Sequence, residues 1–190
     1  VYIVIMKVLI LHGYRNNSKI LFYQSKFLRS ILKYNFIIPN APNITFEKPK
    51  KLILIEISEI NLYQTEKRLF KNHPNLRKSI YLYLGSVSDT SLIKSIFESH
   101  NIDILFHAAA YKHVPLLEFN PLQAIKNNIF TTKILCSFAK KYNINHMVMI
   151  STDKAVRPTN VMGATKRVAE IIVQGYAKES RNKKNHTSKI

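Results

Sequence analysis

Runs of apolar residues alternate with amphipathic segments along most of the chain. The runs show no regular in/out alternation, which is typical of strands buried on both faces of a parallel sheet. Strands are expected at 1–11, 51–56, 80–85, 103–109 and 146–152. Helices are expected at 23–34, 58–72, 89–100, 121–142 and 160–178. This order predicts an α/β fold: a doubly wound parallel sheet of Rossmann type.

Local signals refine the boundaries of these elements. Asp89 and Asn120 stand where helix N-caps are expected. The stretch 36–49 carries three prolines and is expected to be a loop inserted before the second strand. We expect one dinucleotide-binding domain over 1–178, followed by a polar, frayed tail over 179–190.

Ligands of doubly wound sheets bind beyond the carboxyl ends of the strands, so the residues there form the candidate site. Glu56 ends the second strand, where an acid can accept hydrogen bonds from an adenosine ribose and repel a 2′-phosphate. The alternative for Glu56 is a solvated acid. Ser86 and Val87 follow the third strand, in the turn that holds adenine in related folds. An acid is common at the Ser86 position, so a weakened adenine contact is expected, and core packing is the alternative for Val87.

The fourth strand ends in three successive alanines followed by polar residues. Alanines let the backbone approach a flat ligand closely, and the polar groups then reach the mouth of the site. The alternative for the histidine is a structural role. These candidates are Ala108, Ala109, Ala110, Tyr111, Lys112 and His113.

The fifth strand leads into a polar triplet. Thr152 can hydrogen-bond a sugar hydroxyl, Asp153 is a candidate general acid, and Lys154 can tune that acid or bind an oxyanion. The alternative is a solvated turn. Met162 occupies the usual place of a catalytic tyrosine, and Lys166 lies one helical turn later, so both are expected on one face. A lysine there can hold a nicotinamide ribose.

Two long stretches carry a family resemblance: HAAAYKHVPLLE at 107–118 and ISTDKAVRPTNVMGATKRVAE at 150–170. With similarity dense over 51–177, the chain resembles the polysaccharide biosynthesis (CapD-like) family of extended short-chain dehydrogenases. In one branch of that family a methionine, here Met162, replaces the tyrosine. That branch resembles membrane-anchored 4,6-dehydratases that act on UDP-N-acetylglucosamine and keep the stereochemistry at carbon 5. The resemblance implies a lyase that binds a UDP-sugar and NAD, with NADP as the alternative.

The resemblance also implies a mechanism, in which NAD takes hydride from carbon 4, water leaves across carbons 5 and 6, and hydride returns to carbon 6. Thr152 is implied to take over the tyrosine's hydroxyl function, Asp153 to protonate the leaving hydroxyl, and Lys154 to act as base at carbon 5. Lys166 is implied to bind the cofactor ribose, and Asn128 to support that lysine through water. Substrate contacts are implied for Lys112, His113 and Asn160.

The start of the chain departs from the family's glycine-rich pyrophosphate loop. Gly13 is the only glycine before Gly85, so the loop within 12–50 is expected to be replaced or lengthened, although 25–35 resembles the family's first helix. The family's C-terminal substrate region and upstream membrane helices are also expected to be absent. We therefore expect a fragment that binds NAD weakly and turns over no UDP-sugar by itself.

Three alternatives stay open: a non-catalytic remnant, an epimerase or reductase of the same fold, and a basic nucleic-acid-binding protein. The net charge of +18 favours the last. However, the lysines are scattered, with short clusters at 48–51 and 181–184, and biased base composition explains the charge better. Met162 argues against the epimerase or reductase, whose chemistry normally uses the tyrosine. Nucleic-acid binding is therefore not expected.

Composition adds little about the surroundings of the protein. The single cysteine, Cys136, excludes an internal disulfide and is expected to be a small buried residue on a helix. The apolar stretch 1–11 is too short to span a bilayer and has no cleavage site. We expect a cytoplasmic location, at the inner membrane if the parent protein is the long form. No metal is expected, and a homo-oligomer is left open.

Overall fold

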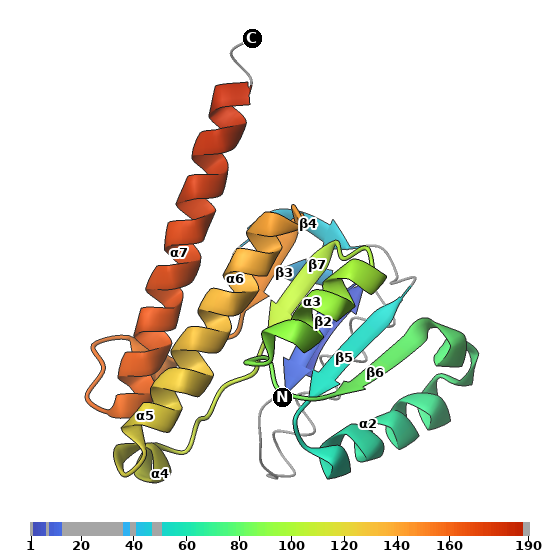
Figure 1. Cartoon of the computed structure of the whole chain (residues 1–190), viewed down its shortest axis with the longest axis horizontal. Helices are drawn as coiled ribbons and strands as arrows, with labels where there is room; N and C mark the ends of the chain where they lie inside the picture. Colours follow the sequence, from blue (N-terminus) through green and yellow to red (C-terminus); the bar gives the residue numbers. More distant parts are fainter. Residues whose placement is uncertain (1, 7, 13–35, 39–40, 47–50, 188–190) are drawn as a thin grey trace.

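The computed structural model describes residues 2–6, 8–12, 36–38, 41–46 and 51–187. Its centre is a six-stranded sheet in the order β6-β5-β1-β2-β7-β8 (Figure 1). The strands of this sheet are β1 (Tyr2–Met6), β2 (Val8–His12), β5 (Leu52–Glu56), β6 (Ile80–Leu84), β7 (Ile104–His107) and β8 (His146–Met149). The pairs β2–β5, β2–β7, β5–β6 and β7–β8 are parallel, which confirms the predicted parallel sheet.

The apolar run 1–11 does not form the single strand that the sequence predicted. It forms two strands, and β1 pairs antiparallel with β2, with Ile5 opposite Val8. β1 is also antiparallel to β5 and β7, whereas β2 is parallel to both. A continuous apolar run does not distinguish one long strand from two short ones, because both give the same unbroken run of apolar residues.

The proline-containing stretch 36–49 was predicted to be a loop, and this is wrong for most of it. Strands β3 (Phe36–Ile38) and β4 (Ala41–Phe46) form a separate two-stranded antiparallel sheet. Phe36 pairs with Phe46 and Ile37 with Thr45. Proline is tolerated at the ends and edges of sheets, so Pro42 in β4 does not prevent pairing. The predicted helix at 23–34 and Gly13 lie outside the described residues.

Helices follow the strands as predicted. In Figure 1, α3 and α6 lie across one face of the sheet, and the long α7 runs beside α6. The predicted helix 121–142 is interrupted by a π-helical turn, η2. The helical segments are α2 (Glu59–Asn72), η1 (Pro74–Ser79), α3 (Thr90–Ser99), α4 (Val114–Glu118), α5 (Pro121–Ala124), η2 (Ile125–Phe130), α6 (Thr131–Lys141), η3 (Asp153–Ala155) and α7 (Val161–Thr187).

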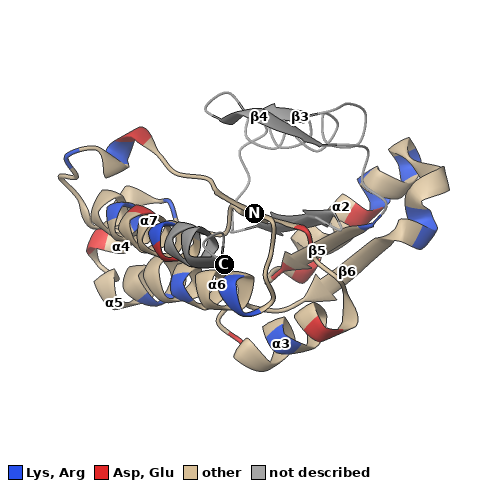
Figure 2. Cartoon of the chain, turned by 90° about the horizontal axis from the view of Figure 1, so that it is seen from above, with Lys and Arg blue, Asp and Glu red and all other residues tan. Residues whose placement is uncertain are grey.

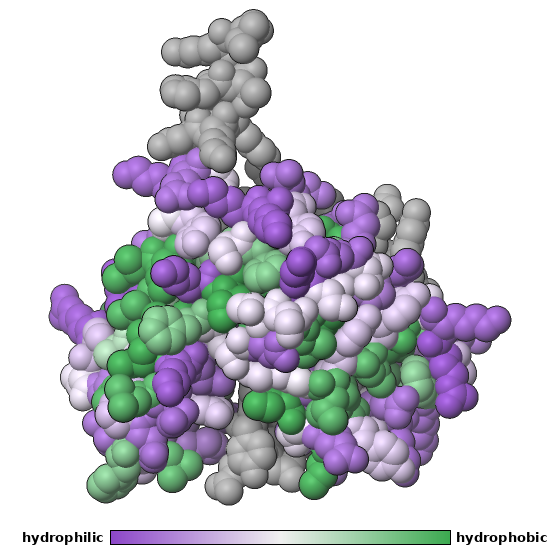
Figure 3. Space-filling model, in the orientation of Figure 1, coloured by the Kyte–Doolittle hydropathy of each residue, from purple (hydrophilic) through white to green (hydrophobic). Residues whose placement is uncertain are grey.

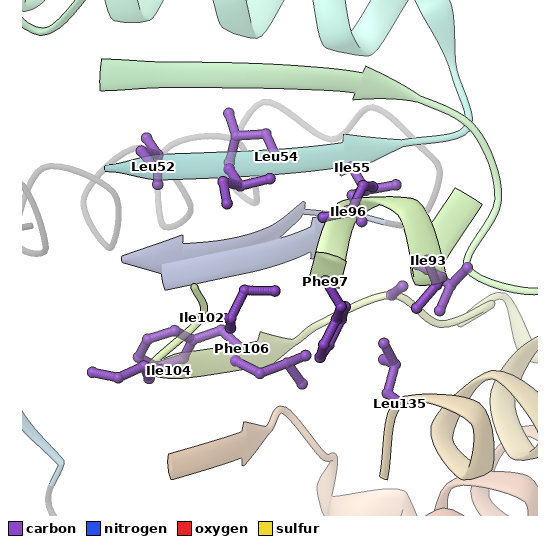
Figure 4. Packing of buried hydrophobic residues seen from close by; sticks show 14 of the residues in the cluster. Leu52, Leu54, Ile55, Ile93, Ile96, Phe97, Ile102, Ile104, Phe106 and Leu135 are labelled. Carbon is purple, nitrogen blue, oxygen red and sulfur yellow. The ribbon is translucent and has the colours of Figure 1, made fainter. Parts of the chain in front are cut away.

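The main hydrophobic core lies between the sheet and its helices (Figure 4). Helix α3 contributes Ile93, Ile96 and Phe97, whose spacing of three and four residues puts them on one buried face. The side chains of Leu54 on β5 and Leu105 on β7, two strands separated by β1 and β2, are fully buried. The central strands are thus covered closely enough to hold their carboxyl ends in fixed positions.

The predicted helix starts have different outcomes. Asp89 caps α3, because its carboxylate accepts hydrogen bonds from the backbone N–H groups of Ser91 and Leu92 at 3.0 and 3.1 Å. Asn120 occupies the N-cap position of α5, but its side chain makes no capping bond. Its amide instead donates to the carbonyl of Leu116 at 2.8 Å, so the predicted cap by Asn120 is wrong in its chemistry.

Helix α7 continues through Thr187, into the segment predicted to be a frayed tail. The residues after Gly175 include neither proline nor glycine that would stop a helix. Lys140 on α6 also pairs with Glu179 at 2.5 Å, which ties α7 to its neighbour beyond the predicted boundary. Cys136 is buried on α6 as predicted, and burial raises the pKa of its thiol to about 12.

The surface of the described part carries scattered charge and some apolar groups. Lys and Arg are spread over α2, α3, α6 and α7 and do not form a single stripe (Figure 2). Apolar side chains are exposed on and between α4 and α5, namely Leu116, Phe119 and Leu122. These two helices lie at the lower left of Figure 1, and Figure 3, in the same orientation, shows apolar surface there. Among the described residues, no helix is long and apolar enough to cross a membrane.

Candidate functional site

The candidate residues after β5, β6, β7 and β8 lie at one edge of the sheet, because these strands run parallel to one another through β2. β7 and β8 are neighbours in the sheet, so the alanine-rich loop after β7 adjoins the polar triplet after β8. β5 and β6 are likewise neighbours, which places Glu56 beside the turn that carries Ser86. Gly13 lies outside the described residues and cannot be placed at this edge.

Lys166 is a buried lysine on α7, with 6% of its surface exposed. Its ammonium donates a hydrogen bond to the backbone carbonyl of Ile150, directly after β8, at 2.6 Å. Burial lowers the pKa of Lys166 to about 8, and the nearby carboxylate of Glu170 partly opposes that shift. Because a buried charge is costly without a partner, a lysine kept here at the end of a central strand indicates a functional role.

The Thr152–Asp153–Lys154 turn is mostly exposed at the end of β8. The Thr152 hydroxyl donates to the Asp153 carboxylate at 2.9 Å, and the Lys154 ammonium lies 3.5 Å from the same oxygen. The hydrogen bond from Thr152, followed by the charge of Lys154, lowers the pKa of Asp153. Asp153 is therefore a carboxylate near neutral pH in this state, and an acid role requires a covering group that raises its pKa.

Gly163 lets this turn pack directly on the first turn of α7. A Cβ at Gly163 would collide with the carbonyl oxygen of Lys154 and would lie 3.2 Å from Cβ of Pro158. Ala155, at the end of the turn, is completely buried. Residue 163 therefore has to be glycine for the Thr152–Asp153–Lys154 turn to keep this position.

Two residues cap the start of α7, and one of them was predicted to contact substrate. The side-chain oxygen of Asn160 accepts a hydrogen bond from the N–H of Gly163 at 2.8 Å. The carboxylate of Glu118, on α4, accepts from the N–H of Val161 at 2.7 Å. Glu118 lies in the family stretch 107–118 but was not predicted to cap this helix, because it is 43 residues away from Val161. In this structure Asn160 thus serves as a helix cap.

Met162 is buried in a small apolar cluster between the short helices and α7. The other buried residues of this cluster are Leu117 and Ala124, and the partly buried Tyr111 and Val114 pack against it. Lys166, one turn later, is buried as well, so both residues face inward as predicted. A thioether has no proton to transfer, and Met162 contributes packing under the loop that carries Tyr111.

Asn128 is buried on η2 and binds the loop after β7. Its side-chain oxygen accepts from the Tyr111 N–H at 2.8 Å, and its amide donates to the Tyr111 carbonyl at 3.1 Å. The amide also donates to the hydroxyl of Thr165, the residue before Lys166, at 3.0 Å. The direct partners of Asn128 are thus the loop and α7. The water-mediated support of Lys166 that the family resemblance implied stays a prediction.

The loop after β7 places the predicted site residues at the carboxyl end of the strand, and their side chains differ in solvent exposure. Ala109 is buried, Ala108 and Ala110 are half-buried, and His113 is exposed. Lys112 is half-buried, and burial lowers the pKa of its ammonium. Lys112 is therefore the loop's partly desolvated cation, a suitable partner for an anionic group.

Glu56 is buried at the end of β5, which excludes the solvated-acid interpretation. Its carboxylate accepts a hydrogen bond from the N–H of Ser58 at 2.8 Å. Burial raises the pKa of Glu56, with backbone hydrogen bonds acting in the opposite direction.

The turn after β6 carries the two residues predicted near adenine. Val87 packs in the main hydrophobic core, which was the alternative to an adenine contact. The Ser86 and Ser88 hydroxyls form a hydrogen bond of 2.8 Å.

His107, at the end of β7, was not singled out from the sequence. Its Nε2 lies 2.8 Å from the hydroxyl of Thr132, which donates its proton to the carbonyl of Asn128 at 2.7 Å. Nε2 of His107 must therefore carry the hydrogen, and Nδ1 is an acceptor without a hydrogen-bond partner among the described residues. Burial, assisted by the charge of Lys166, lowers the pKa of His107 to about 3, so it is neutral.

Comparisons with known proteins agree with this geometry. The family described as polysaccharide biosynthesis protein matches residues 41–190. Capsular polysaccharide biosynthesis protein CapD of Staphylococcus aureus is 41% identical over 132 residues, which cover 70% of this chain and 22% of the relative. The chain thus spans about a fifth of the length of that relative.

Solved structures give the same fold. Pen from Bacillus thuringiensis matches with a TM-score of 0.62 and 32% identity, over 68% of this chain and 39% of that chain. UDP-glucose 4-epimerase from Bifidobacterium longum, in complex with NAD+ and UDP, matches with a TM-score of 0.55 and 24% identity, over 65% and 40% of the two chains. These likenesses confirm the Rossmann-type fold.

The start of the chain has a different likeness. A family described as serine hydrolase (FSH1) matches residues 3–71, less than half of the chain. The polysaccharide biosynthesis match begins only at residue 41, so it does not support the predicted resemblance of 25–35 to that family's first helix. The glycine-poor segment 12–50 lies within the hydrolase match.

The polysaccharide biosynthesis match covers most of the chain, and its residues 41–190 include the strand ends, the buried lysine and the polar turn. The chain therefore belongs to the polysaccharide biosynthesis protein family.

Proposed function

We propose that this chain is the core of an NAD-dependent nucleotide-sugar 4,6-dehydratase that acts on UDP-N-acetylglucosamine for surface polysaccharide biosynthesis. The observation that carries the proposal is the buried ammonium of Lys166, bonded to Ile150 next to the exposed Thr152–Asp153–Lys154 turn. A fixed cation beside a cluster of proton donors and acceptors suits a reaction in which hydride and protons move at adjacent carbons.

The residues present fit the two ends of NAD. Glu56, a carboxylate at the end of β5, is an acceptor for the adenosine ribose hydroxyls and would repel the 2′-phosphate of NADP. Lys166 is the donor for the nicotinamide ribose, and the small side chains of Ala108 and Ala110 leave room for close approach. When bound, NAD supplies a reversible hydride acceptor, so the reaction has no net redox change.

The acid–base work falls to the turn after β8. Thr152 is assigned to the hydroxyl at carbon 4, Asp153 to protonation of the leaving hydroxyl at carbon 6, and Lys154 to proton removal at carbon 5. Asp153 and Lys154 are exposed and 3.5 Å apart, so a sugar can reach both. A sugar that covers the turn would exclude water and raise the pKa of Asp153 towards that of a useful acid.

Met162 favours this chemistry over an epimerase or reductase of the same fold. It cannot relay a proton, and its packing against Leu117 and Ala124 gives it a structural position. The proton chemistry then rests on the polar turn alone. A non-catalytic remnant is the remaining alternative, and the following experiment separates it from the dehydratase.

The test is a chimera in which residues 51–178 replace the matching segment of the S. aureus relative. With NAD and UDP-N-acetylglucosamine, we expect a 4-keto-6-deoxy product by mass spectrometry. The 190-residue chain alone is expected to give none, since Gly13 is its only glycine before Gly85 and cannot supply a glycine-rich phosphate loop. A folded but inactive chimera would establish the remnant.

Asp153→Asn in the chimera is expected to lower turnover by about 10²–10⁴-fold, the usual contribution of a general acid. The amide keeps the size and the hydrogen bond from Thr152 but cannot donate a proton as an acid. The matched control is Glu98→Gln, an exposed acid on α3 whose carboxylate lies 3.8 Å from the Lys94 ammonium and accepts a 3.4 Å hydrogen bond from the Tyr142 hydroxyl. Equal turnover of the two variants would remove Asp153 from the mechanism.

A further inference from the structure

The π-helical turn η2 places two consecutive asparagines against one backbone amide. The side-chain oxygens of Asn127 and Asn128 both accept a hydrogen bond from the Tyr111 N–H, at 3.0 and 2.8 Å. Neighbouring residues of a regular α-helix point about 100° apart, and the wider π turn reduces this angle so that both reach one donor. Such turns often occur at functional sites.

The following two residues satisfy the carbonyls of the same asparagines. The Thr131 hydroxyl donates to the carbonyl of Asn127, and the Thr132 hydroxyl donates to that of Asn128 at 2.7 Å. A π turn displaces carbonyl groups from their ordinary helical partners, and threonine hydroxyls can replace these. The carbonyls of both asparagines are therefore bonded, and their side-chain oxygens are held at the Tyr111 N–H.

The two asparagines use different hydrogen-bonding groups of their side chains. Asn128 acts as acceptor and donor, since its amide also binds the Tyr111 carbonyl and the Thr165 hydroxyl. Asn127 uses only its oxygen towards Tyr111. An aspartate at 127 preserves that bond, whereas an aspartate at 128 loses both donated bonds.

We propose that Asn127 is a positioning residue. With Asn128 it fixes the Tyr111 amide and so holds the loop 108–113 in the conformation that presents Lys112 to an anionic group of the nucleotide sugar. The inference rests on the proposed function for the identity of the ligand, and on the contacts at Tyr111 for the fixed loop. Lys112 directly follows the clamped residue and is the partly desolvated cation of the loop.

The test measures amide exchange in the 190-residue chain and ligand binding in the chimera described above, each unaltered and as Asn127→Ala, Asn127→Asp and Asn128→Asp. For Asn127→Ala we expect the Tyr111 amide to exchange with solvent about fivefold faster, and UDP-N-acetylglucosamine to bind about fivefold more weakly, the effect of one lost hydrogen bond. Asn127→Asp is expected to restore both values. Asn128→Asp loses the donated bonds to the Tyr111 carbonyl and the Thr165 hydroxyl, so it is expected to depart from the unaltered protein in both values. Exchange is followed by NMR and binding by calorimetry, with the exposed Asn101→Ala as control.

A purely structural role would lower the thermal midpoint of Asn127→Ala without the rescue of affinity by Asn127→Asp. Unchanged Tyr111 exchange in Asn127→Ala, or no rescue by aspartate, would overturn the proposal. Absence of UDP-N-acetylglucosamine binding by the unaltered chimera would count against the dehydratase and against the loop's role in binding. The exchange rates alone would then decide whether Asn127 fixes Tyr111.

Discussion

Lys166→Met is expected to stabilise the fold and to abolish function. The side chain is buried, and its pKa falls from 10.5 to about 8. A shift of this size means that keeping the ammonium charged costs the folded state roughly 3 kcal/mol. The methionine variant avoids this cost but loses the hydrogen bond to Ile150, which is worth about 1 kcal/mol. The free energy of unfolding near pH 7 should therefore rise by about 2 kcal/mol. Turnover of the chimera should fall by about 10²-fold or more.

The stabilisation should depend on pH in a defined direction. Below pH 8 the lysine is charged in both the folded and the unfolded chain, so the folded state carries the full cost of burial. Between pH 8 and 10.5 the folded state binds fewer protons than the unfolded state, and the unaltered chain gains stability as the pH rises. The advantage of Lys166→Met over the unaltered chain should thus shrink across that interval and reverse towards its upper end, where mainly the lost bond to Ile150 remains, as measured by urea unfolding.

Lys154→Met is the matched control, because Lys154 is half-exposed and its partner Asp153 is almost fully exposed. Exposed ion pairs contribute little, so we expect a change within about 0.5 kcal/mol and no trend with pH. Turnover should nevertheless fall if Lys154 is the base at carbon 5. A Lys166→Met chain that is less stable, with no dependence on pH, would contradict the description of Lys166 as a buried ammonium.

The sequence predicted the parallel strands and their helices well because long apolar runs and helical spacing survive in any context. Ile93, Ile96 and Phe97 illustrate this, since their spacing alone marks the buried face of α3. The sequence failed where the apolar run is unbroken, as in 1–11, which contains two strands, β1 and β2. It also failed at η2, because a π turn leaves the pattern of apolar residues nearly unchanged.

The candidate site was predictable in membership but not in arrangement. The strand-end rule located Glu56, the loop after β7 and the turn after β8, since it depends only on the order of elements. Long-range partners such as Glu118 for α7 and Thr132 for His107 could not be predicted, because no spacing links them. The burial of Lys166 was also hidden, since most helical lysines keep their charge in water.

Gly163→Ala is expected to disrupt the polar turn from beneath. The new methyl would meet the carbonyl oxygen of Lys154, and the carbonyl carbon and Pro158 lie within 3.1 and 3.2 Å. Backbone atoms cannot move aside as a flexible side chain can, so the turn must shift. Such overpacking costs about 1–3 kcal/mol, despite the higher helix propensity of alanine. Turnover of the chimera should fall by about 10²-fold, because catalytic groups displaced by an ångström lose their alignment.

Gly175→Ala supplies the control on the same helix, because nothing lies within 4 Å of a Cβ at that position. It should stabilise the chain by about 0.5–1 kcal/mol, the gain from alanine in an exposed helix, and leave turnover unchanged. The two glycine variants should therefore move the free energy of unfolding, measured by urea titration, in opposite directions. If Gly163→Ala behaved like Gly175→Ala in both measurements, the Thr152–Asp153–Lys154 turn would not depend on its contact with α7, and its assigned position at the site would be wrong.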